Sequence, residues 1–173
     1  MSASRISLSA LFLFVVFTVQ ESAIARINFP ITGFSLFLAV LIGLMALEDR
    51  SGAIALGFIG GLILDLSPTS NSPFGLWALV LTLVGYVIGA NRESIGDFTS
   101  RPGAFVLFVA LASALTLLLS LILSALVGDQ AGNLTRNLVV ILGNTLWTFL
   151  FAPLVLPLLS LLRNTTLTSR ERS

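Results

Sequence analysis

The residue that most invites a chemical role is Asp65, a carboxylate that closes an otherwise apolar segment. A charged side chain in a membrane segment is costly, and it usually serves a partner, a transport path or a buried contact. Gly57, Gly61 and Asp65 recur every four residues, so a helix places them on one face. Glycines on such a face let another helix pack closely. The spacing predicts a close helix contact that ends at an acid, which Arg136 or the 67–72 loop would compensate.

The rest of the sequence lacks the residues of a catalytic centre. It contains no histidine, cysteine or lysine, which excludes thiolate chemistry, disulfides and the usual zinc or haem ligands. There is no lysine nucleophile, G-x-S-x-G motif or phosphate-binding loop. Asp65, Glu21 and Asp129 are too scattered along the chain to indicate a metal site. We therefore expect no enzyme activity, no cofactor and no metal.

The composition indicates an integral membrane protein. The chain is 56% hydrophobic and 10% charged, and its mean hydropathy is +1.03, whereas soluble domains average about 25% charged residues. A membrane-spanning helix needs about 20 apolar residues. We expect an all-α, polytopic helix bundle with about six transmembrane helices in a single domain, residues 1–173. The apolar stretches, of which the third is short, are residues 8–25, 30–47, 52–66, 73–90, 103–127 and 137–162.

The arginines predict the orientation of the six spans. Cytoplasmic loops of membrane proteins carry an excess of basic residues. If the N-terminus is cytoplasmic, only Arg26 and Arg136 lie outside. The inside set is then Arg5, Arg50, Arg92, Arg101, Arg163, Arg170 and Arg172. We expect a multi-pass protein of the bacterial cytoplasmic membrane with both termini in the cytoplasm. An alternative treats the first span as a signal peptide, cleaved after the A-x-A pattern at Ala23–Ala25.

Small and polar residues predict further helix contacts. Gly75, Gly85 and Gly89 share a stripe of the fourth apolar stretch, and the last two form a second close-packing motif. Asn144, on one face of the sixth stretch with Asn137, is expected to form a hydrogen bond between helices. Two prolines of that stretch, Pro153 and Pro157, predict a kink.

The region from residue 48 to 90 resembles the MreD family of bacterial rod shape-determining membrane proteins. The matching residues are Gly57, Gly60, Gly61, Leu64-Asp65-Leu66, Pro73-Phe74-Gly75-Leu76, Ala78-Leu79 and Gly85-Tyr86. The resemblance implies a non-enzymatic role in the cell-elongation machinery, in cell-shape control and lateral peptidoglycan synthesis. It implies MreC, a single-span protein with a large external domain, as the partner, and MreB, RodA and a transpeptidase as the wider complex.

Carried over by motif, Asp65 and Gly75 belong to the characteristic helix–turn–helix of the family. We hypothesise that this element shapes the surface that receives MreC, whose helix would pack on a glycine and alanine stripe among membrane lipids. No feature indicates nucleic-acid binding.

A second architecture is similar. The substrate-binding subunits of energy-coupling-factor vitamin transporters also have six helices, and they hold their ligand in an external pocket. Trp77, Asn133, Arg136 and Asp65 are candidates for such a pocket in this chain. The predicted external loops are short and leave little material for a lid over a vitamin, which favours the scaffold interpretation.

Overall fold

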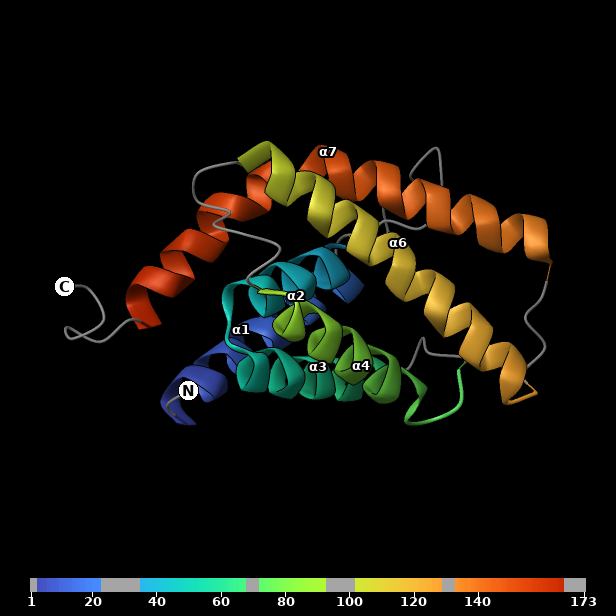
Figure 1. The fold of residues 1–173 in the computed structure, drawn as a ribbon, viewed down its shortest axis with the longest axis horizontal. Coiled ribbons are helices and arrows are strands. Elements are labelled where there is room, and N and C mark those ends of the chain that lie inside the picture. The colour runs from blue at the N-terminus through green and yellow to red at the C-terminus, as the bar shows by residue number, and fades with distance from the viewer. Residues whose placement is uncertain (1–2, 23–34, 68–71, 93–101, 129–132, 167–173) are drawn as a thin grey trace.

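The computed structural model describes residues 3–22, 35–67, 72–92, 102–128 and 133–166, and every regular element within these ranges is a helix, as the sequence predicts. Figure 1 shows their arrangement. The helices are α1 (Ala3–Ser22), α2 (Leu36–Leu47), α3 (Arg50–Asp65), α4 (Leu76–Ala90), α6 (Pro102–Leu126) and α7 (Leu134–Thr166). The candidate cleavage pattern Ala23–Ala25, Arg26 and Asp129 lie outside the described residues.

Two helix starts illustrate how local sequence sets these bounds. The predicted fourth stretch begins at residue 73, but α4 begins at Leu76. Gly75 precedes it with a φ of +90°, a left-handed conformation that other residues rarely adopt, so the chain turns sharply before the helix. At the other end of the pair, Asp49 caps α3 by accepting a hydrogen bond from the Gly52 amide at 3.2 Å.

Among the described helices, α6 alone is long and apolar enough to cross a membrane by length and composition. The segment Ile6–Ser22, α2 and α4 are apolar but shorter. α7 has 33 residues and contains Pro153 and Pro157. It bends along its length, and its last residues lie at the same end of the bundle as the first residues of α1 (Figure 1).

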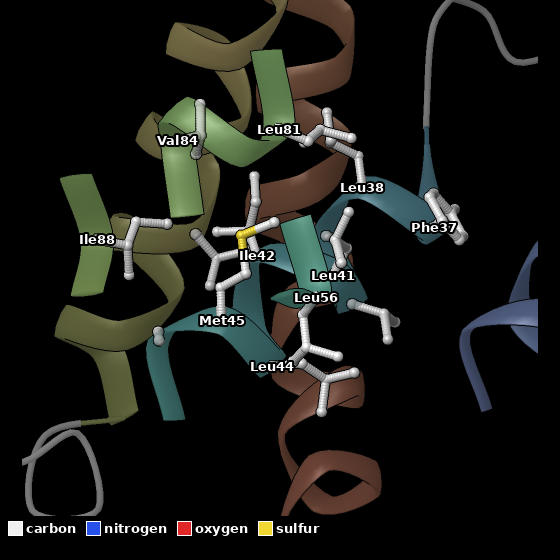
Figure 2. Packing of buried hydrophobic residues seen from close by; sticks show 14 of the residues in the cluster. Phe37, Leu38, Leu41, Ile42, Leu44, Met45, Leu56, Leu81, Val84 and Ile88 are labelled. Carbon is white, nitrogen blue, oxygen red and sulfur yellow. The ribbon is translucent and has the colours of Figure 1, made fainter. Parts of the chain in front are cut away.

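α2 forms the centre of the fold. Ten consecutive residues, from Phe37 to Ala46, are buried, and a helix that is apolar on all sides belongs in a core. α2 packs against α1, α3, α4, α6 and α7. Figure 2 shows its side chains meeting Leu56 of α3 and the buried face of α4 formed by Leu81, Val84 and Ile88.

Four of the other described helices form two hairpins, and α1 packs against α2 and α3. α3 and α4 run side by side as the most extensively packed pair, and α6 and α7 form the next (Figure 1). α4 and α6 meet over a smaller area, and their junction forms the groove described below.

Candidate functional site

The glycines of α3 allow its backbone to lie directly on that of α4. A Cβ on Gly57 would lie 2.8 Å from the Leu81 carbonyl carbon, and one on Gly61 would lie 2.6 Å from the Ala78 nitrogen. Both obstacles are backbone atoms, so a side-chain rotation cannot relieve either collision. Close helix contact at these positions therefore requires glycine.

α4 contributes two glycines to the same contact. A Cβ on Gly85 would lie 2.9 Å from the Ala53 carbonyl carbon, and one on Gly89 would lie 2.6 Å from the Arg50 Cα. Gly61 thus faces Ala78 near one end of the pair, and Gly89 faces Arg50 at the other. The two helices are antiparallel and their backbones touch along the whole pair.

Asp65 closes one end of this pair by capping α4. Its Oδ1 accepts a hydrogen bond from the Trp77 amide at 3.1 Å, and its Oδ2 accepts one from the Ala78 amide at 2.9 Å. The first amides of a helix have no partner within that helix, and Gly75 at the cap position has no side chain to offer. A carboxylate from the neighbouring helix supplies both acceptors, and the positive end of the helix dipole favours its charge.

The main-chain amides of α4 are partners that the sequence did not indicate for Asp65. The predicted contact with the 67–72 loop stays a prediction, because residues 68–71 lie outside the described residues. Arg136 is exposed in the first turn of α7. No signal in the sequence indicated the capping role, because the start of α4 directly after Gly75 appears only in the structure.

The opposite end of the pair is also fixed by polar contacts. Asp49 accepts a hydrogen bond from the Ser51 hydroxyl at 2.8 Å, and this bond is the main cause that lowers the pKa of Asp49. The Arg50 guanidinium lies 4.4 Å from the centre of the Tyr86 ring, a cation–π contact between α3 and α4.

A second capping cluster surrounds the start of α2. Asn144 Oδ1 accepts a hydrogen bond from the Ser35 amide at 2.9 Å, so this asparagine joins α7 to α2. Gln20 Oε1 of α1 accepts one from the Leu36 amide at 2.8 Å. Asn144 and Thr148 are fully buried, and Asn144 Nδ2 and Thr148 Oγ1 have no hydrogen-bond partner. Two helices, α1 and α7, thus converge on the start of a third, α2.

The residues proposed for a vitamin pocket lie at the contact of α3 with α4 and at the start of α7. The Asp65 carboxylate accepts its bond from the Trp77 main chain, while Asn133 and Arg136 are exposed at the start of α7. A space of about 160 Å³ lies between α6 and α7 and is lined in part by Ser120, Ser124 and Asn137.

A larger space lies between α4 and α6, and no feature of the sequence predicted it. This groove has a volume of about 400 Å³ and is lined almost entirely by apolar side chains. Its α6 wall follows helical spacing from Phe108 to Leu119, a pattern indistinguishable in the sequence from an ordinary packing face. The groove arises from how far the two helices separate, which no residue pattern reveals.

The hydrogen bonds of Asp65, Asp49, Asn144 and Gln20 described above therefore all serve helix starts. No group of three or more acidic, histidine or cysteine side chains suited to a metal ion occurs in the described ranges. The most elaborate site, the contact of α3 with α4, can hold two helices rigidly together, and its geometry provides no acid–base pair.

Comparison with known proteins identifies one matching family. The family model described as rod shape-determining protein MreD matches residues 3–165. No curated protein and no solved structure matches the chain significantly. Because the family match covers nearly the whole chain, this protein belongs to the MreD family of rod shape-determining membrane proteins.

Proposed function

We propose that this chain is a non-enzymatic scaffold of the cell-elongation complex, which binds the membrane helix of an MreC-like protein. As a single domain, it would cross the bacterial cytoplasmic membrane about six times with both termini in the cytoplasm. MreB, RodA and a transpeptidase would join it in the wider complex that directs lateral peptidoglycan synthesis.

The observation that supports the scaffold role is the closed contact of α3 with α4. Its four glycines and both Asp65 oxygens are used within the chain. The polar groups thereby fix the shape of the pair and leave an outer surface of large apolar side chains. Such a surface offers a partner helix a fixed shape to pack against and offers a substrate no reactive groups.

The same contact changes where a partner helix would bind. The glycine stripe is already covered by the facing helix, so MreC would pack on the outer side of the pair. Phe58 of α3 and Leu79 and Tyr86 of α4 are exposed there. We assign the glycines the role of building this surface, and the exposed side chains the role of contacting the partner.

The arrangement of the helix ends supports the proposed topology. Arg50 and Arg92 lie at the end of the α3–α4 pair opposite Asp65, where the positive-inside rule places the cytoplasm. The start of α1 and the end of α7 lie at one end of the bundle (Figure 1), as an even number of crossings requires.

Site-specific crosslinking in native membranes tests this proposal. A photoreactive amino acid would replace Phe58 or Leu79 in the tagged full-length chain, with exposed Leu126 at the far end of α6 as the control position. We expect an MreC-like protein to crosslink from the first two positions and to copurify with wall-synthesis proteins. Recovery of transport ATPases with a coupling subunit would instead establish the vitamin-transporter alternative.

A further inference from the structure

The groove between α4 and α6 is an apolar channel with one polar end. Its apolar lining consists of Leu83, Val84, Val87, Ile88, Phe108, Leu111, Ala112, Leu115 and Leu119. The polar residue is Asn91, directly after the last residue of α4. The groove therefore runs from the end of α4 toward the middle of that helix.

The α4 wall of the groove covers the second half of that helix, from Leu83 to Asn91. A helix rises about 1.5 Å per residue, so this wall spans roughly 12 Å, and half of a hydrocarbon core of about 30 Å is about 15 Å. The α6 wall, from Phe108 to Leu119, lies in the middle of α6. Under the proposed topology, on which this step depends, Asn91 marks the cytoplasmic end of the groove.

The lining suits an acyl chain better than a partner helix. A transmembrane helix needs a contact through the whole hydrocarbon core, and helix contacts in membranes are rich in small residues. Here the groove follows α4 only from Leu83 to Asn91, and Ala112 is its one small residue. Large branched side chains keep another backbone at a distance, while a flexible hydrocarbon chain can fill the space between them.

The polar end indicates the headgroup. Asn91 Nδ2 donates one hydrogen bond to the Val87 carbonyl at 2.8 Å, and an amide nitrogen has a second hydrogen to donate. Arg92 follows it and is exposed. Basic residues between membrane helices on the cytoplasmic side attract anionic lipid headgroups. Because residues 93–101 also include Glu93 and Asp97, the headgroup preference must be measured on the full chain.

We propose that this groove binds one acyl chain of an anionic phospholipid from the cytoplasmic leaflet, with the headgroup phosphate held by Asn91 and Arg92. The bound lipid would complete the packing between α4 and α6, where the protein itself leaves a gap. On α4 this site adjoins the outer face assigned to the partner helix, because Leu83 lies on the same side of the helix as Leu79 and Tyr86.

Native mass spectrometry of the purified full-length protein tests the proposal, with added phosphatidylglycerol or phosphatidylcholine. Ala112→Phe would fill the groove, and Ala125→Phe adds the same group at an exposed position outside it. Arg92→Gln removes the headgroup charge, and Arg136→Gln removes an exposed charge near the other end of the bundle. Circular dichroism and gel filtration would check folding, and Leu115→Trp, at an exposed lining residue, would replace Ala112→Phe if that variant misfolds.

We expect Ala112→Phe to remove tight binding of both lipids and Ala125→Phe to leave it unchanged. Arg92→Gln should weaken phosphatidylglycerol about fivefold, the effect of one basic residue near the membrane surface, without affecting phosphatidylcholine. Equal loss from both phenylalanine variants would overturn the groove as the site. An unchanged lipid preference in Arg92→Gln would overturn the headgroup assignment. A partner-protein helix crosslinked to Leu115 would also overturn the proposal, whereas loss of crosslinks at Phe58 alone would contradict only the proposed function.

Discussion

Replacing Asp65 with alanine tests whether one carboxylate holds the α3–α4 pair together. The substitution removes both acceptors of the Trp77 and Ala78 amides. Gly75 cannot replace them because it has no side chain. Two amides at the start of α4 would then lose their partners at a position that water reaches only in part, since Asp65 is half-buried.

The expected loss follows from known capping energies. Removing a capping side chain costs about 1 kcal/mol and up to about 2 kcal/mol. Hydrogen bonds to charged groups contribute about 1.5–3 kcal/mol each when buried, and partial exposure reduces this value. We expect Asp65→Ala to lower the free energy of unfolding by about 2–3 kcal/mol. Asp65→Asn retains one acceptor oxygen and should lose about half as much.

Equilibrium unfolding of the full-length protein in mixed micelles, followed by helical circular dichroism, measures these losses. Arg136→Ala is the matched control, because a charge-pairing role for Asp65 would make the two alanine variants similar. Capping predicts that Arg136→Ala stays within about 0.5 kcal/mol of the unsubstituted protein, as expected for a surface change. The capping explanation fails if Asp65→Ala is as stable as the unsubstituted protein, or if Arg136→Ala is equally destabilised.

Three further predictions concern other contacts. Gly57→Ala should destabilise the protein by about 1–3 kcal/mol because its methyl group meets backbone; Gly103→Ala, with open space around it, should be neutral in the same unfolding assay. Asn144→Ala leaves the Ser35 amide without its acceptor and should lower the free energy of unfolding by about 1–3 kcal/mol. Thr148→Val removes an unpaired buried hydroxyl, so in thermal melts it should be neutral or stabilising by about 1 kcal/mol. The Ser51 hydroxyl holds the pKa of Asp49 below its ordinary 3.8. The Asp49 carboxylate therefore stabilises the fold above pH 3.8, and this stabilisation is lost as the pH falls through the lower folded-state pKa. In an acid titration of stability, Asp49→Asn should lack that loss, and an acid profile equal to that of the unsubstituted protein would contradict the assignment.

The sequence predicted the helices well because the length of each apolar stretch can be counted directly in the sequence. Each described helix overlaps one apolar stretch. The four-residue spacing of Gly57 and Gly61 predicted a face for close helix contact, and a Cβ at either position would meet the α4 backbone. The partner of that contact could not be predicted, because small-residue spacing identifies a face and leaves open what covers it. The structure covers it with α4.

The partner of Asp65 was missed for a different reason. An acid in an apolar segment suggests an opposite charge or a polar loop as its partner, and Arg136 and the 67–72 loop were the two predicted candidates. The actual partners are backbone amides, which every residue except proline possesses and which no sequence pattern highlights. The groove was missed because its volume depends on the separation of α4 and α6, to which residue periodicity gives no clue.

The capping of α4 by Asp65 has a consequence for how the chain enters a membrane. Under the proposed topology, the Asp65 carboxylate would face lipid or the translocation channel, with no helix end to bond, when α3 alone has been synthesised. The amides that satisfy it follow 12 and 13 residues later in the chain. In a bilayer, the two segments are thus best inserted together as one hairpin. A break in translation between them would leave the first segment poorly anchored.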